Sequence, residues 1–333
     1  MIQKKGVLPV FIPFVGCPKR CIYCDQNSIT DIKLVNFEYD VENQLKYFLQ
    51  IKRDWSILAF YGGSFNLLNK TQRLFLYDLA KKYKFNKIRV SCYPSGFDNY
   101  LIDEFHKHDV AEIELGVQSF SDKVIEVNGR DYSCDDVIGI INRLKSEGFR
   151  VGIQIMVGMY GEKLDDVKKN VEVIRTIDFD YFRIYPTVVF ENTKLANYKN
   201  NLKFSFEEVI AVSSIYYLLA SYKGATVLRV GLHNNSNFQN KIVGGYFHPS
   251  FGDIIMTFVI YLYLRINEKN RLCRNFPNYK RVIVKSFDVI YDKKITFSEI
   301  LKTVWSEYFE NNRWEIKGEI FDLAKEFWCK ANE

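Results

Sequence analysis

Short apolar runs alternate with helical patterns over the first part of the chain. The runs are rich in residues that favour strands, and they occupy residues 7–12, 57–61, 87–92, 111–117, 150–157 and 181–185. Apolar positions at the helical spacing predict helices over residues 38–50, 71–82, 99–108, 135–147 and 164–176. Repeated strand–helix units predict a parallel sheet with crossover helices. Because the first run is continuous, we expect its strand to be buried on both faces.

Six such units predict an α/β fold, a partial (β/α)6 TIM-type barrel, in residues 1–190. The regular alternation of strands and helices does not continue in residues 191–333, where we expect a small α+β C-terminal extension packed on the barrel. Its predicted elements are a helix at 206–221, a strand at 226–230, a loop at 231–245, a helix at 254–264, a strand at 282–287 and two helices within 296–328.

Composition and charge narrow the class of protein. Of the 333 residues, 47% are hydrophobic and 16% are aromatic, which is enough for a large packed core. The N-terminus lacks the pattern of a signal peptide, and the apolar stretch 254–264 is too short to span a bilayer, so we expect a cytoplasmic protein with no membrane contact. The formal net charge of +6 and a basic run at 265–285 are compatible with RNA or another anionic partner, although most such runs are solvated surface.

Three of the seven cysteines stand close together after the first strand. Cys17, Cys21 and Cys24 have the spacing C-x3-C-x2-C, which suits the thiolate ligands of an iron–sulfur cluster. Three thiols leave one iron of a [4Fe–4S] cluster open to a ligand that is not protein. A zinc site would need a fourth ligand and usually shows paired spacings, and unrelated thiols are the remaining alternative.

Other candidate residues fall at the predicted carboxyl ends of strands, where this architecture collects its chemistry. Gly62, Gly63 and Ser64 follow the second strand, and glycines there let a ligand approach the backbone. Gln118 follows the fourth strand, and Gly158 follows the fifth. Each motif alone is weak, because a Gly-Gly pair is usually a turn. Their shared position is the stronger signal.

The segment 11–26, with the three cysteines and Tyr23 just before the last, closely resembles the cluster loop of radical S-adenosylmethionine (radical SAM) enzymes. This resemblance implies a [4Fe–4S] cluster on Cys17, Cys21 and Cys24, with S-adenosylmethionine on the open iron. It further implies that the cofactor is contacted by Tyr23, Gly62, Gly63, Ser64, Gln118, Arg130 and Gln154. The resemblance also implies a low-potential electron donor of the flavodoxin or ferredoxin type.

Within that family, the segment 114–119 followed by Arg130 resembles the Elongator catalytic subunit and oxygen-independent coproporphyrinogen III oxidase. The Elongator type is the nearer resemblance, over about residues 7–252. Two motifs depart from it, at 93–95, where this chain reads Tyr-Pro-Ser, and at 159–162, where it reads Met-Tyr-Gly-Glu. The acetyltransferase domain of the Elongator subunit is not expected, since about 80 residues follow Gly252.

The resulting expectation is a radical SAM enzyme, an oxidoreductase or transferase that cleaves S-adenosylmethionine and modifies a substrate, with RNA or tRNA as one candidate. The alternatives are an enzyme acting on a small molecule such as a tetrapyrrole, and a non-catalytic iron–sulfur electron-transfer protein. No catalytic residue on the substrate side can be named. Tyr185, His233 and His248 are candidates by location, and for each the pattern favours a structural role.

Overall fold

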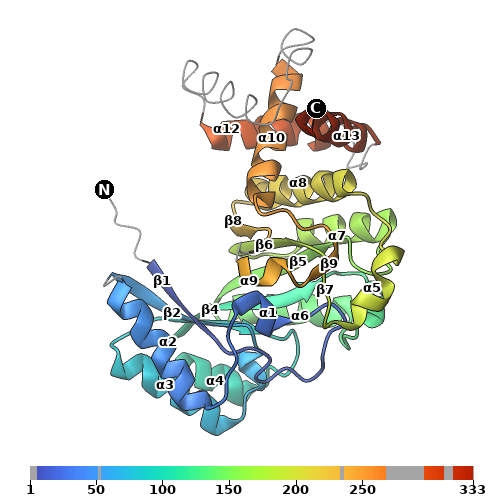
Figure 1. Ribbon diagram of the computed structural model, residues 1–333. Helices are drawn as coiled ribbons and strands as arrows, with labels where there is room; N and C mark the ends of the chain where they lie inside the picture. The colour runs from blue at the N-terminus through green and yellow to red at the C-terminus, as the bar shows by residue number, and fades with distance from the viewer. Residues whose placement is uncertain (1–5, 52–53, 233–235, 268–295, 311–317, 333) are drawn as a thin grey trace.

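Seven parallel strands form one curved sheet, whose order in space follows the chain (Figure 1). The computed structural model describes residues 6–51, 54–232, 236–267, 296–310 and 318–332. The strands lie in the order β1 (Gly6–Phe11), β2 (Trp55–Tyr61), β3 (Ile88–Cys92), β4 (Val110–Gln118), β5 (Arg150–Val157), β6 (Tyr181–Pro186) and β8 (Thr226–Val230). The predicted α/β half-barrel is confirmed, and β8 extends it by a seventh strand.

Helices connect successive strands. They are α2 (Phe37–Ile51), α3 (Lys70–Lys82), α4 (Asn99–Lys107), α6 (Cys134–Ser146), α7 (Leu164–Thr176) and α8 (Phe206–Tyr222). Their starts follow ordinary capping chemistry. Ser133, for example, accepts a hydrogen bond from the Asp136 amide while the Asp136 carboxylate accepts one from the Ser133 amide, which closes a capping box at α6.

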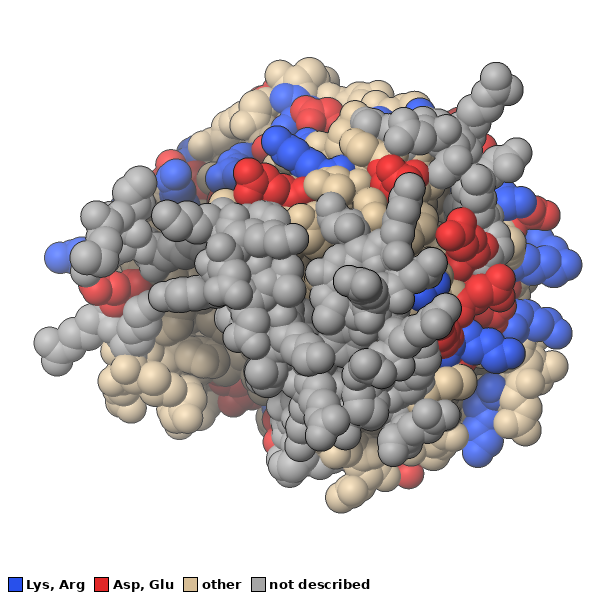
Figure 2. Space-filling model, turned by 90° about the horizontal axis from the view of Figure 1, so that it is seen from above, with Lys and Arg blue, Asp and Glu red and all other residues tan. Residues whose placement is uncertain are grey.

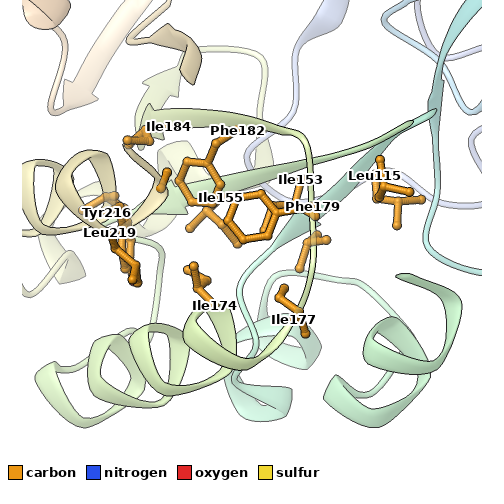
Figure 3. Close-up of a cluster of buried hydrophobic side chains, with 14 of the residues drawn as sticks. Leu115, Ile153, Ile155, Ile174, Ile177, Phe179, Phe182, Ile184, Tyr216 and Leu219 are labelled. Carbon is orange, nitrogen blue, oxygen red and sulfur yellow. The ribbon is translucent and has the colours of Figure 1, made fainter. Parts of the chain in front are cut away.

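Alternate residues of each strand point to opposite faces of the sheet. On β5 and β6 the apolar set Ile153, Ile155, Phe182 and Ile184 is almost fully buried and packs toward α7 and α8 (Figure 3). The residues between them face the concave side, which carries polar side chains. The prediction that β1 is buried on both faces is wrong, because alternate residues of β1 are only half-buried where the half-barrel stays open.

Several short elements carry no sequence signal strong enough to predict them. They are α1 (Gln26–Thr30), η1 (Phe65–Leu67), α5 (Asp122–Val127), β7 (Val188–Phe190), η2 (Lys194–Asn201), α9 (Ser236–Gln239) and β9 (Ile242–Gly245). Strands β7 and β9 pair in an antiparallel two-stranded sheet, within a region partly predicted as loop.

The remaining helices pack together beyond α8, at the top of Figure 1. They are α10 (Phe251–Asn267), α12 (Phe297–Trp305), the π-helical turn η4 (Ser306–Glu310) and α13 (Gly318–Asn332). The Trp305 ring stacks on Tyr222 of α8 with centroids 5.0 Å apart, which fixes α12 against the barrel. The predicted strand at 282–287 lies outside the described residues, and the domain division at residue 190 stays a prediction. Across the described ranges, no helix combines the length and apolar character that crossing a membrane requires.

Candidate active site

The loop after β1 is fixed by hydrogen bonds to distant parts of the chain. The Gln26 side-chain oxygen accepts from the Phe14 amide, which turns the loop back toward α1. The Ile22 amide donates to the Asn128 carbonyl oxygen over 3.2 Å, and the Leu195 amide donates to the Ile22 carbonyl oxygen over 2.8 Å. The three cysteines therefore sit on a loop whose shape depends on the rest of the barrel.

Cys17, Cys21 and Cys24 line one pocket at the carboxyl edge of the sheet. The Cys17 sulfur lies 3.5 Å from the Ser64 hydroxyl oxygen. Burial, together with the neighbouring thiols, raises the pKa of Cys24 to about 12, so a thiolate here needs a cation beside it. Within the described ranges, no three His, Cys, Asp or Glu side chains gather closely enough to hold a single metal ion.

The glycine pair after β2 forms another wall of the same pocket. Gly62 has φ +88°, a conformation that side chains disfavour. A Cβ atom on Gly63 would collide with the carbonyl oxygens of Ile12 and Val15. Both positions therefore require glycine, and they bring bare backbone to the pocket surface.

Arg130 places a cation beside the thiols. One terminal nitrogen donates to the Cys21 sulfur over 3.2 Å and to the Tyr23 hydroxyl over 3.3 Å, while the other donates to the Gly116 carbonyl oxygen over 2.7 Å. The rings of Tyr93 and Tyr132 flank the guanidinium, with its carbon 4.6 Å and 4.9 Å from their centroids. Its Nε is buried and has no hydrogen-bond partner among the described residues. The Nε–H group of Arg130 is therefore a hydrogen-bond donor that the described residues leave without an acceptor.

Gln118 and Gln154 meet on the concave face, where the Gln154 amide donates to the Gln118 side-chain oxygen over 3.1 Å. Gln118 has φ +67°, which is unusual for a residue with a side chain and stores strain at the end of β4. All ten predicted cluster and cofactor residues line the same pocket.

A charged network below the pocket was not predicted from the sequence. Glu114 accepts hydrogen bonds from Arg183, from Arg89 over 3.3 Å and from the Tyr61 hydroxyl over 3.1 Å. Glu112 pairs with Arg89 and accepts from the Tyr181 hydroxyl over 2.9 Å. These side chains come from four strands, and their one sequence signal is that each stands at an inward position of its strand.

The three substrate-side candidates end in different places. Tyr185 packs with Tyr23, Met156 and Met159 near the cluster loop. His248 lies near Trp328 and accepts a hydrogen bond from the Ser250 amide, and burial lowers its pKa. It is not among the residues that line the pocket. His233 lies outside the described residues.

Each of the two motifs that depart from the Elongator type contains a residue with a structural role. Tyr93 covers Arg130, as described above. Glu162 is fully buried and accepts from the amides of Gly158 over 2.7 Å and Met159 over 3.1 Å. Burial outweighs these two hydrogen bonds and raises the pKa of Glu162 to about 8.

The fold and site together define an α/β half-barrel with a three-cysteine loop after its first strand. Residues 11–174 match the sequence profile of the family described as the Radical SAM superfamily. The chain belongs to this superfamily, whose members use a [4Fe–4S] cluster and S-adenosylmethionine.

Individual relatives are similar over parts of the chain. The tRNA uridine(34) acetyltransferase of Methanocaldococcus infernus is 34% identical over 97 residues, which cover 28% of this chain and 18% of the relative. The solved structure of Methanocaldococcus infernus Elp3 with an N-terminal deletion has a TM-score of 0.59 at 19% identity, covering 78% of this chain and 62% of that one.

The coproporphyrinogen III oxidase HemN of Escherichia coli gives a TM-score of 0.52 at 14% identity, covering 98% of this chain and 90% of HemN. These structural likenesses show the shared fold. A further relative, an uncharacterized protein of Methanocaldococcus jannaschii, is 23% identical over 208 residues. The chain spans less than two thirds of the length of these curated relatives, 64% of the Methanocaldococcus jannaschii protein and 18% of the acetyltransferase.

Proposed function

We propose that the chain binds a [4Fe–4S] cluster through Cys17, Cys21 and Cys24, binds S-adenosylmethionine beside it, and modifies an RNA substrate by a radical reaction. The observation that carries the proposal is the convergence of three thiols, two obligatory glycines and one half-buried arginine on a single pocket. A protein that only carries electrons would need thiols to bind its cluster, but it would not need the glycine pair or the arginine.

The residues present fit this pair of cofactors. A cation is what the thiols of Cys17 and Cys24 need, because burial raises the pKa of both and disfavours their thiolate forms. A bidentate guanidinium suits a carboxylate such as that of methionine, and Arg130 lines the pocket with a buried Nε that has no hydrogen-bond partner among the described residues. When bound, the two cofactors supply a low-potential electron and a hydrogen-abstracting group.

In this proposal the chain's own residues bind and orient the cofactor. Gly62 and Gly63 offer backbone groups to the methionyl amine, and Ser64 stands beside Cys17. Gln118 and Gln154 offer amide groups to the ribose. Arg130 holds the carboxylate and, through Tyr23 and Cys21, fixes the cluster loop.

RNA is the proposed substrate because a relative that shares 34% identity over 97 residues is a tRNA-modifying protein. The basic run at 265–285 gives no structural support, since almost all of it lies outside the described residues. Arg265 itself pairs with Glu326 over 3.8 Å. On the described part of the face at that end, basic and acidic side chains are interleaved (Figure 2). A flavodoxin or ferredoxin type of protein is the proposed electron donor.

The test is anaerobic reconstitution with iron and sulfide, followed by dithionite and S-adenosylmethionine, with 5′-deoxyadenosine measured by chromatography. Cys24→Ala is expected to lose the cluster absorbance and to abolish product, because one iron loses its thiolate. Cys329→Ala is the matched control, since this thiol is exposed on α13, and it is expected to match the wild type. A wild-type protein that takes up zinc alone and makes no product would contradict the proposal.

A further inference from the structure

The segment from Lys194 to Lys203, here called the η2 rim, contacts the cluster loop, whose residues Cys21 and Tyr23 line the pocket. Its Leu195 amide holds the cluster loop through the Ile22 carbonyl oxygen. Its Tyr198 ring packs on Tyr160, which follows β5 at the carboxyl edge of the sheet. The ring centroids are 5.1 Å apart and the planes meet at 35°. The rim therefore connects the cluster loop with the end of β5.

The tyrosine pair lies at the surface, and hydrogen bonds hold the backbone around Tyr160. Tyr198 is 44% exposed and Tyr160 is half-buried. The Tyr160 carbonyl oxygen accepts from the Asn128 side chain over 2.9 Å. The buried Glu162 holds the preceding turn through two amides. The aromatic pair is thus presented beside the cluster loop, to which Asn128 connects Tyr160, and Tyr160 stands where the Elongator-type motif has no tyrosine.

The charge of the rim has one sign. Lys194, Lys199 and Lys203 are exposed, and residues 192–206 contain no Asp or Glu. The aliphatic part of the Lys199 side chain lies against Gly244 of β9. The lysines are spread along a surface segment, as phosphates are spread along a nucleic acid strand.

Exposed aromatic rings that alternate with lysines are the usual surface for unpaired nucleic acid, since bases stack on the rings and phosphates meet the cations. We propose that Tyr198 and Tyr160 stack an unpaired RNA base while Lys194, Lys199 and Lys203 bind the flanking phosphates. This contact positions the RNA over the pocket. The inference rests on the proposed function, because it assumes that the radical reaction acts on RNA.

The experiment measures binding of the reconstituted full chain to a short single-stranded RNA that carries one 2-aminopurine, whose fluorescence reports stacking. Tyr198→Ala is expected to weaken binding by about ten-fold and to abolish the fluorescence change, whereas Tyr198→Phe retains both. Tyr47→Ala on α2, where the side chain is 60% exposed, is the matched control and is expected to bind like the wild type. Replacing the three lysines with Gln is expected to flatten the salt dependence of the affinity.

Each outcome is decisive. If Tyr198→Ala binds as tightly as the wild type, base stacking at the rim is overturned while RNA can remain the substrate. If the wild type does not bind this RNA at low salt, the rim is not an RNA surface. If binding and stacking are as expected but no 5′-deoxyadenosine forms in the assay above, the radical function fails and the RNA-binding rim stands.

Discussion

The two faces of the sheet are built from alternate residues of the same strands, yet their chemistry is opposite. The outer face is apolar, as Phe60, Ile155 and Phe182 illustrate, and helices cover it. The concave face carries Glu114 and Arg183 and ends in the pocket. The difference teaches that one strand can stabilise the fold with one set of alternate residues and prepare a site with the other set. On one strand, substitutions of outward-facing residues should therefore change the stability of the fold, whereas substitutions of inward-facing residues should change the binding of the cofactor.

The largest effect is expected on the concave face, from Glu114→Gln. This change leaves Arg183 buried without its carboxylate, and breaking a buried ion pair by removing one partner costs about 3–5 kcal/mol. The free energy of unfolding, measured by urea denaturation, reports it. Glu114→Leu combined with Arg183→Met is expected to recover most of the loss, because no buried charge is left alone. A double variant as unstable as the single one would show that the two charges do not stabilise each other.

A smaller effect, which depends on pH, is expected at Glu162, at the edge where the two faces meet. Its pKa of about 8 in the folded chain lies above the ordinary value of 4.5, so the folded state keeps a proton that the unfolded state loses between these pH values. Stability from this group is complete below about pH 4.5 and falls by at most ~1.4 kcal/mol per pH unit as the pH rises toward 8. Glu162→Gln keeps an acceptor oxygen and cannot titrate. The unfolding free energy of this variant relative to wild type should rise from pH 5 to pH 8, whereas parallel profiles would contradict the shift.

The smallest effect is expected on the outer face, from Ile155→Val. Removing one methylene from this fully buried side chain costs about 0.5–1.5 kcal/mol. Binding of S-adenosylmethionine to the reconstituted protein, measured by isothermal titration, is expected to stay unchanged, because Ile155 points toward α7 and α8. A loss of cofactor affinity as large as the loss of stability would show that the two faces are not independent.

The sequence predicted the strands of the half-barrel to within two residues, because each carries a compact apolar run between helical patterns. The local spacing of Cys17, Cys21 and Cys24 indicated that the three thiols share one site, and all three line one pocket. Their role as cluster ligands stays a prediction. The pairing of Gln118 with Gln154 depends on the register between β4 and β5, which shifts after Leu115, so no local pattern contains it. Strands β7 and β9 are three and four residues long, too short for a periodic signal.

The contacts of the charged network and of the η2 rim could not be predicted from the sequence for a related reason. Arg89, Glu114 and Arg183 are far apart in the chain, and only the curvature of the sheet brings them together. Tyr160 and Tyr198 meet because η2 returns to the cluster loop, and a short 3-10 segment gives no hydrophobic pattern to predict its path. The local spacing of residues can indicate candidate metal ligands, whereas long-range packing determines which side chains surround them.

The hydrogen bond from Leu195 to Ile22 has a consequence for the order of biosynthesis. The cysteine loop leaves the ribosome early, but one of its anchors is synthesised much later in the chain. At ordinary elongation rates of about 5–20 residues per second, the interval is roughly ten seconds or more. During that time the three thiols are on a nascent chain without the frame that holds them. We therefore expect the iron–sulfur cluster to be inserted after the whole half-barrel has been translated, when the cysteine loop is held in its final shape.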